Sequence, residues 1–174
     1  MIIQNVLKEG AELLRVKKIK TYNLDSELIL SSILNIKREK LIIDQNKKIV
    51  SDIYNKFFWY IKKRSKNLPI SYILNKKEFW SLDFMVTKHT LIPRPETELM
   101  VEGILKNIRK RVKILDIGTG SGCILISLLK ELKLSKGIGI DICSKAIDVA
   151  KKNSKKHDVN RRVKFFRGSF NDIF

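Results

Sequence analysis

Apolar residues within residues 1–66 recur at the spacing of a helix face. Steps of three, four and seven residues place side chains on one side of an α-helix, so the spacing predicts a succession of helices. At the start of the second helix, Asn23 or Asp25 is the expected capping residue. In the last helix, over residues 49–66, we expect one face to point inward and the basic residues to face solvent. The residues of the inward face are Ile53, Phe57, Tyr60 and Ile61. The apolar positions of the earlier helices are Val6, Leu7, Leu13, Leu14, Leu24, Leu28, Ile29 and Ile33, and the basic residues of the last helix are Lys56, Lys62, Lys63 and Arg64.

The hydrophobic period changes from that of a helix to that of a strand near Glu78. Polar and apolar residues then alternate in steps of two, which predicts a β-hairpin or paired strands over residues 78–92. Pro95 and the acidic residues Glu96 and Glu98 are typical of the first turn of a helix, which we expect to end near Arg109. We therefore expect an N-terminal helical domain over residues 1–75, a β-hairpin linker over 76–95 and a second domain over 96–174.

The second domain alternates between strand and helix patterns. Such alternation is typical of a parallel sheet with right-handed crossovers, so the expected fold class is α/β. The predicted strands span residues 112–117, 137–140 and 163–167, and the predicted helices span residues 121–132 and 144–156.

The candidate ligand-binding segment follows the first predicted strand, which ends near Asp116. Gly118, Gly120 and Gly122 alternate there with other residues. Glycines let the backbone turn tightly and approach a ligand closely, and the free N–H groups of the following helix favour electron-rich groups. Asp141 lies at the end of the second strand, where its carboxylate can accept both hydroxyl protons of a ribose.

Four interpretations of this segment are open. A dinucleotide site would place the third glycine one residue later, and a Walker-type phosphate loop would need a lysine directly after the glycines, whereas the next one is Lys130. An S-adenosylmethionine site of the class I type matches the early third glycine and both acids. The fourth interpretation is a tight strand–helix turn that binds nothing.

Further segments of the chain resemble the HemK/PrmC enzymes, which are the release-factor glutamine N5-methyltransferases. In chain order the matching segments read LPISYI at residues 68–73, KEFWSL at 77–82, LIPRPETE at 91–98 and DIGTGSG at 116–122. The opening helices resemble the family's N-terminal helical domain at residues 24–30 and 38–41. The resemblance therefore covers nearly the whole chain.

The resemblance implies a Rossmann-like class I methyltransferase domain that uses S-adenosylmethionine as cofactor. It also implies methylation of the side-chain amide of the glutamine in the Gly-Gly-Gln motif of peptide chain release factors. By position, Asp141 is expected to hold the ribose, Asp116 to brace the loop, and Phe170 to lie on the adenine side. The residues expected to line the methionine and ribose of the cofactor are Gly118, Thr119, Gly120, Ser121 and Gly122.

The sequence departs from the family at the methyl-acceptor site. The family holds the glutamine with an Asn-Pro-Pro-Tyr motif, and the prolines of this chain, Pro69, Pro93 and Pro95, belong to no such motif. No catalytic residue can therefore be assigned, and we expect the chain to be the front part of a longer enzyme or a truncated product. The family's sheet has more strands than the three predicted here, so we expect the first strand to expose an unpaired edge that favours association.

Composition affects the expected partners more than the fold. The formal net charge of +18, with 36 Lys and Arg residues against 18 Asp and Glu residues, suits proximity to the ribosome or RNA. An AT-rich genome also explains the charge, because 27 of the basic residues are lysines. A nucleic-acid N-methyltransferase and a catalytically inactive binding fragment are the alternative functions.

The remaining chemistry of the sequence points to a cytoplasmic protein without metal. The cysteines, Cys123 and Cys143, and the histidines, His89 and His157, are too few and too scattered for a zinc site or a disulfide framework. No apolar run approaches the roughly 20 residues of a membrane span, and the first residues lack a signal-peptide pattern, so we expect no membrane partner.

Overall fold

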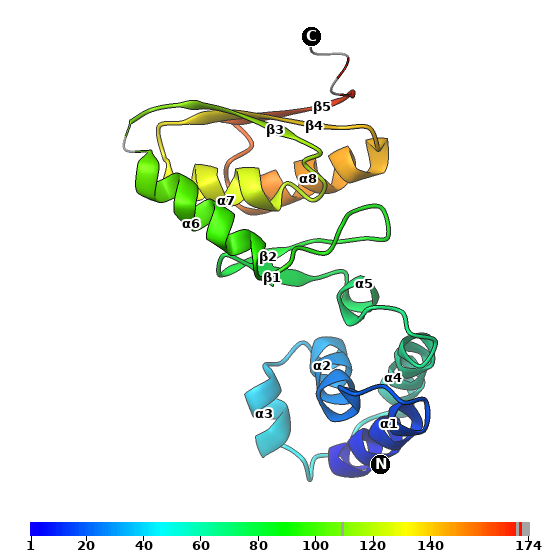
Figure 1. The fold of residues 1–174 in the computed structure, drawn as a ribbon. Helices are drawn as coiled ribbons and strands as arrows, with labels where there is room; N and C mark the ends of the chain where they lie inside the picture. Colours follow the sequence, from blue (N-terminus) through cyan, green and yellow to red (C-terminus); the bar gives the residue numbers. More distant parts are fainter. Residues whose placement is uncertain (109, 170, 172–174) are drawn as a thin grey trace. The chain divides into compact units, whose positions relative to one another are not determined.

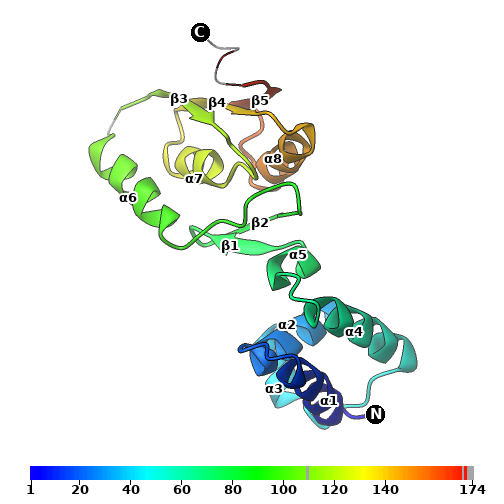
Figure 2. The same ribbon diagram turned by 45° about the vertical axis from the view of Figure 1, so that its right-hand side comes forward.

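The computed structural model describes residues 1–108, 110–169 and 171. The chain forms two compact units, Met1–Leu74 and Asn75–Phe174. Figures 1 and 2 show that the first unit is built from helices and that the second combines strands with helices. Within the described part of the chain, no helix is both long enough and apolar enough to span a bilayer.

The first unit packs its helices around one apolar core. Its helices are α1 (Ile3–Val16), α2 (Tyr22–Leu34), α3 (Arg38–Ile43), α4 (Ser51–Arg64) and α5 (Ile70–Leu74). Of the α4 residues predicted to face inward, Phe57 and Ile61 are fully buried, whereas Ile53 and Tyr60 are half-buried. The prediction was wrong for Leu13 and Leu24, which are 36% and 40% exposed. The other fully buried residues of this core are Val6, Leu14, Ile29, Leu30 and Leu41.

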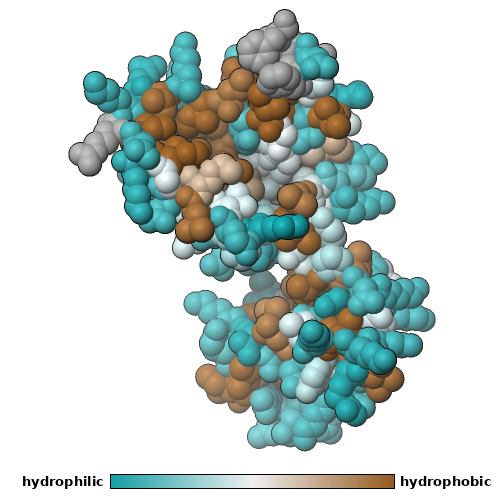
Figure 3. Space-filling model, in the orientation of Figure 1, coloured by the Kyte–Doolittle hydropathy of each residue, from teal (hydrophilic) through white to brown (hydrophobic). Residues whose placement is uncertain are grey.

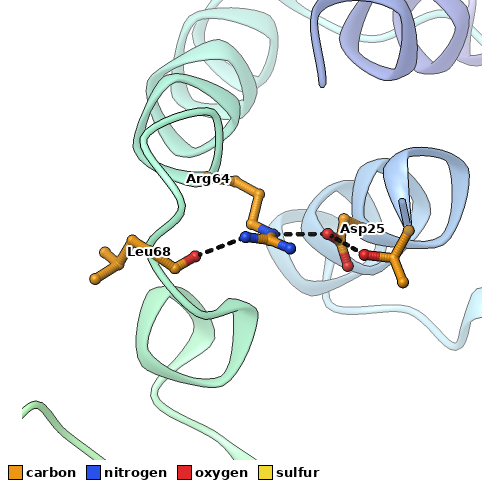
Figure 4. A network of polar contacts seen from close by, with 4 residues as sticks. Asp25, Arg64 and Leu68 are labelled. Carbon is orange, nitrogen blue, oxygen red and sulfur yellow. Dashed lines mark hydrogen bonds and ion pairs between the residues drawn. The ribbon is translucent and has the colours of Figure 1, made fainter. Parts of the chain in front are cut away.

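A buried ion pair joins α2 to α4 (Figure 4). Arg64 Nε donates to Asp25 Oδ2 at 2.7 Å, and Thr21 Oγ1 donates to the same oxygen at 2.7 Å. Arg64 Nη1 also donates to the carbonyl of Leu68 at 3.3 Å. Only 4% of the Asp25 side chain and 16% of the Arg64 side chain are exposed.

Two sequence predictions about α2 and α4 were wrong. Arg64 was expected to face solvent, but its guanidinium turns toward α2 because a buried carboxylate lies within its reach. Asn23 and Asp25 were expected to cap α2, but the helix starts at Tyr22, so both residues lie inside it. No side chain caps its first turn.

The second unit begins with a short hairpin and continues as an alternating βα segment. The elements are β1 (Lys77–Phe79), β2 (Leu82–Phe84), α6 (Thr97–Asn107), β3 (Lys113–Ile117), α7 (Cys123–Glu131), β4 (Lys136–Asp141), α8 (Ser144–Lys156) and β5 (Val163–Arg167). Strands β3, β4 and β5 lie in this order and are all parallel, which confirms the α/β prediction. From β3 onward each boundary lies within two residues of the predicted one. The predicted end of α6 at Arg109 lies outside the described residues.

The hairpin is shorter than predicted and packs within the second unit. We expected extended backbone over residues 78–92, but β2 ends at Phe84, and a turn over residues 87–90 follows, in which Thr90 N donates to the carbonyl of Thr87. Phe79 and Phe84 are buried in the core of the unit, so the hairpin is a part of this unit, whereas we expected residues 76–95 to be a linker.

The turn of the hairpin is held by two helices. Trp80 and Ser81 have φ values of 53° and 54°, which non-glycine residues adopt in tight hairpin turns. Trp80 N donates to Glu98 Oε1 at 2.7 Å and Trp80 Nε1 donates to Glu131 Oε1 at 3.0 Å. Glu98 was expected to favour the start of α6, and in the structure its carboxylate also fixes this turn.

Among the residues that the structure describes, helices cover only one face of the parallel sheet. Figures 1 and 2 both place α7 and α8 on the same side of β3, β4 and β5. On the opposite face, hydrophobic residues gather over the sheet in the upper part of Figure 3. The exposed apolar residues of these strands are Leu115, Ile117, Ile138 and Phe166, with 42% to 50% of each accessible. Among the described residues, no strand pairs with the outer edge of β3.

Replacing Arg64 by methionine should destabilise the first unit. Arg64→Met keeps the aliphatic stem but leaves the buried Asp25 carboxylate without its cation, which costs about 3–5 kcal/mol in the free energy of unfolding. Hydrogen exchange of the α2 and α4 amides under increasing urea measures this change. Arg15→Met is the matched control, because the exposed pair of Arg15 with Glu12 should contribute almost nothing. Equal losses in the two variants would contradict the role of the buried pair.

Candidate functional site

Three loops meet at the carboxyl ends of the parallel strands. Parallel strands end at one edge of a sheet, so the loops that follow β3, β4 and β5 are neighbours. Gly118 N and Thr119 N both donate to the carbonyl of Ile140, at 2.8 and 2.9 Å. Gly168 N, after β5, donates to the carbonyl of Asp141 at 3.1 Å. Backbone hydrogen bonds thus hold the three loops at the same edge.

The carboxylate of Asp141 bridges two of these loops. Its Oδ2 accepts a hydrogen bond from Gly120 N at 2.9 Å, and its Oδ1 accepts one from Cys143 N at 2.9 Å. A carboxylate has about four lone-pair positions, so each oxygen can accept a further bond from a ligand. The half-buried Asp141 side chain is therefore oriented before any ligand binds.

The glycines of the loop have two different roles. Gly118, Gly120 and Gly122 have φ values of 76°, 55° and 78°, which other residues rarely adopt. A Cβ atom on Gly118 would meet no atom within 4 Å, so a ligand can approach the backbone there. A Cβ atom on Gly122 would lie 2.9 Å from Ile126 Cδ1 and 3.3 Å from Ala150 Cβ. Gly122 therefore lets the loop pack closely against α7 and α8.

The side chains of Thr119 and Ser121 point into the protein. Both residues are at most 5% exposed, so they can offer a ligand little beyond main-chain atoms. Thr119 Oγ1 donates to Asp116 Oδ2 at 2.7 Å, which fits the bracing role expected for Asp116. Burial raises the pKa of Asp116, and the nearby charge of Asp141 raises it further, although the hydrogen bond from Thr119 opposes both effects.

The structure brings together most of the residues predicted from the sequence. Gly118 through Gly122 and Asp141 lie at one sheet edge and are joined by hydrogen bonds. Phe170, predicted on the adenine side, lies outside the described residues. An open groove of about 860 Å³ lies over the bare sheet face and is lined by Leu115, Ile138 and Phe166 among others. Its lining includes neither Asp141 nor any residue of the 118–122 loop. The candidate site is therefore identified from the hydrogen bonds and backbone geometry of the loops, and not from this groove.

Asn153 is a residue of the site that was not predicted from the sequence. Asn153 on α8 is completely buried, and its Nδ2 donates to the carbonyl of Ser121 at 2.8 Å. The available signal was its position on the buried face of α8, in helical register with the apolar residues Val149 and Ala150. A polar residue on such a face needs hydrogen-bond partners inside the protein.

Comparison with known families divides the chain in the same way as the structure. Residues 5–74 match the model of the PrmC N-terminal domain. Residues 108–174 match the model of a methyltransferase domain. The first match falls within the helical unit, and the second covers the parallel sheet with α7 and α8.

Several curated proteins are similar to most of the chain. A release factor glutamine methyltransferase of Coxiella burnetii is 39% identical over 153 residues, which are 87% of this chain and 55% of that protein. A second one, of Buchnera aphidicola subsp. Schizaphis graminum, is 41% identical over 82% of this chain and 52% of that protein. The chain thus spans a little over half the length of these relatives.

A solved structure also overlaps part of the chain. It is an RNA methyltransferase from Salinibacter ruber in complex with S-adenosyl-L-homocysteine. Its sequence is 28% identical, and it superposes with a TM-score of 0.39 over 45% of this chain and 50% of that chain.

The two glycine roles predict different losses of stability on substitution by alanine. Gly118→Ala and Gly122→Ala both place a Cβ atom on left-handed backbone, at about 1–2 kcal/mol each. Gly122→Ala also overpacks the contact with Ile126, so its free energy of unfolding should fall by about 1–3 kcal/mol more. Urea unfolding of the two variants, followed by circular dichroism, measures the difference. Similar losses, or a larger loss for Gly118→Ala, would be inconsistent with the packing described.

The raised pKa of Asp116 predicts a pH-dependent effect of Asp116→Asn. The folded chain binds a proton on Asp116 more tightly than the unfolded chain, so ionised Asp116 lowers stability as the pH rises through the raised pKa. Asparagine carries no charge, and its carbonyl oxygen can still accept the bond from Thr119. The stability of the variant relative to wild type should therefore increase as the pH rises from below 3.8 to neutral. Urea unfolding at several pH values tests this, and a difference that is constant or that decreases would refute it.

Proposed function

Because the chain belongs to the HemK/PrmC family of release-factor glutamine methyltransferases, we propose that the protein methylates peptide chain release factors. The methyl group passes from S-adenosylmethionine to the side-chain amide of the glutamine in their Gly-Gly-Gln motif. One structural observation carries the proposal. The oriented carboxylate of Asp141 lies beside a glycine loop whose backbone is open to a ligand at Gly118.

The donor fits these residues in the following way. The carboxylate of Asp141 accepts the hydroxyl protons of the ribose with the lone pairs that Gly120 N and Cys143 N leave free. The open backbone at Gly118 approaches the methionine and ribose side of the donor. Thr119 and Ser121 contribute main-chain atoms, since their side chains are buried. Phe170 is proposed for the adenine side by its position in the sequence.

The reaction depends mainly on how the methyl donor and the glutamine amide are positioned. S-adenosylmethionine supplies an electrophilic methyl group on a sulfonium. The amide nitrogen of glutamine is a poor nucleophile because its lone pair is delocalised, so holding the two reactants in line supplies much of the rate. The loop and Asp141 fix the donor for this step, and no side chain is assigned to the acceptor.

The proposal gives the two units different roles. Residues 1–75, which contain the PrmC N-terminal domain, recognise the release factor, and residues 96–174 bind the donor. The hairpin region, residues 76–95, is attached to the donor-binding unit through its buried phenylalanines. Release factors act in translation, which places the reaction in the cytoplasm. The net charge of +18 supports proximity to the ribosome, whose RNA is polyanionic.

Calorimetric titration with S-adenosylhomocysteine tests the donor site. The chain should bind this product, and Asp141→Asn should raise the Kd by about 10- to 100-fold, because a charged acceptor of ribose hydroxyl bonds is lost. Asp148→Asn is the matched control, since Asp148 lies exposed on α8 of the same unit and should leave the Kd unchanged. Thermal unfolding of each variant shows whether it is folded.

Two outcomes would contradict different parts of the proposal. Equal affinity of wild type and Asp141→Asn would contradict the ribose contact. The substrate is tested by transfer of a labelled methyl group to a release factor, with a factor whose Gly-Gly-Gln glutamine is replaced by alanine as control. Equal labelling of both factors would contradict the substrate assignment. Donor binding without any labelling is the result expected if the acceptor site needs the Asn-Pro-Pro-Tyr motif, which this chain lacks.

A further inference from the structure

We propose that Asn153 on α8 is a positioning residue for the donor site. It fixes the conformation of the glycine loop, residues 118–122, and ties this loop to the segment that follows the hairpin. The inference deepens the proposed function, because it takes that loop to be the place where the donor binds.

The side-chain amide of Asn153 bonds two separate segments at once. Nδ2 donates to the carbonyl of Ser121 at 2.8 Å and to the carbonyl of Met85 at 3.0 Å. Oδ1 accepts from Met85 N at 2.7 Å. Both donor hydrogens and the acceptor oxygen are thus used, and the partners themselves determine which end of the amide is oxygen. No part of Asn153 is exposed to solvent.

Asparagine is the side chain that suits this position. Its neighbours one turn earlier on the buried face of α8, Val149 and Ala150, are apolar, so a polar group here would destabilise the fold unless it were fully hydrogen-bonded. Aspartate has the same shape but no donor hydrogens. Alanine would leave the buried carbonyl of Ser121, and both the carbonyl and the N–H of Met85, without this partner. The three bonds therefore account for a polar residue at an otherwise apolar position.

The carbonyl that Asn153 binds belongs to Ser121, within the glycine loop. Ser121 stands between Gly120, whose N–H bonds Asp141, and Gly122, which packs against α7 and α8. The Ser121 carbonyl shares a peptide with Gly122 N, which donates to the carbonyl of Thr119 at 2.8 Å, and that carbonyl shares a peptide with Gly120 N. Holding the Ser121–Gly122 peptide therefore restrains the position of Gly120 N beside the ribose-binding carboxylate. Removing Asn153 leaves the covalent loop intact but frees this peptide to rotate.

The two bonds between Asn153 and Met85 connect the glycine loop to the hairpin. Met85 directly follows β2, and the next residue, Val86, is completely buried and donates its N–H to the carbonyl of Asn75 at 3.4 Å. Asn75 is the first residue of the second unit. Asn153 thus links the donor loop to the backbone at both ends of the hairpin, and these elements keep one relative position.

Arg162 provides a matched control in the same unit. Its guanidinium also makes three hydrogen bonds to backbone carbonyls, those of Leu129, Leu132 and Ser135, at 2.6 to 3.1 Å. These carbonyls lie at the C-terminal end of α7 and beyond it, whereas the glycine loop precedes the N-terminal end of α7. Loss of either side chain should lower stability, but only the loss of Asn153 should disturb the donor loop.

The experiment compares Asn153→Ala, Asn153→Asp and Arg162→Met with wild type. The Kd for S-adenosylhomocysteine should rise at least about tenfold in the Asn153 variants and stay within about twofold in Arg162→Met, although all three melt earlier. Without ligand, the amides of Gly118, Gly120 and Gly122 should exchange hydrogen at least about tenfold faster in the Asn153 variants. In Arg162→Met the faster exchange should be confined to the C-terminal end of α7.

The possible outcomes separate this inference from the proposed function. Equal Kd changes in the Asn153 and Arg162 variants, with unchanged exchange of the loop amides, would overturn the positioning role. If the wild-type chain did not bind S-adenosylhomocysteine, the proposed donor site would be refuted. The exchange rates of the loop amides alone would then decide whether Asn153 holds the loop. If the buried charge of Asn153→Asp prevented folding, Asn153→Ala would decide the result.

Discussion

The candidate site depends on one bridge, in which the Asp141 carboxylate accepts hydrogen bonds from Gly120 N and Cys143 N. These two amides belong to the loops that follow neighbouring parallel strands, so the carboxylate fixes the distance between the loops. Hydrogen bonds to a charged acceptor are roughly twice as strong as neutral ones, so the carboxylate reinforces the backbone bonds from Gly118 N and Thr119 N to the carbonyl of Ile140. The same carboxylate is the group proposed to bind the donor. Its orientation is therefore determined by the fold before the donor arrives.

Further contacts hold this bridge in place, and they come from several elements of the second unit. Packing of Gly122 against Ile126 and Ala150 sets the loop on the two helices. The buried amide of Asn153 holds the Ser121 carbonyl and the backbone of Met85. The hairpin turn at Trp80 is fixed in turn by carboxylates from α6 and α7. The candidate site is thus held by helices and by the hairpin of the second unit.

Local sequence patterns predicted the elements well and the contacts between them poorly. The alternation of strands and helices from β3 onward follows from burial of one side of each element, which periodicity reports directly. The hairpin strands were predicted too long because the apolar residues Phe84, Met85 and Val86 extend the strand-like pattern up to the turn at Thr87–Thr90. That turn is defined by its hydrogen bonds, which the sequence does not show. The glycine loop and Asp141 were found because residue type and strand position together indicate their chemistry.

The missed interactions join residues that are far apart in the sequence. Arg64 carries the composition of a solvent-facing helix end, and only the fold brings Asp25 within its reach. Asn153 contacts Met85 across 68 positions, and Trp80 contacts Glu131 across 51, so no local pattern contains them. A polar residue on an apolar helix face was the one available sign. It indicates that partners exist, but it does not identify them.

Titration of the ¹⁵N-labelled chain with S-adenosylhomocysteine, followed by two-dimensional NMR, tests the central claim most directly. The account predicts that the largest shift changes fall on the amides of Gly120 and Cys143, which donate to the Asp141 carboxylate, and on the amide of Gly118, where the loop backbone is open to a ligand. Shift changes concentrated on Ile138 and Phe166, over the bare face of the sheet, with these three amides unmoved, would contradict it.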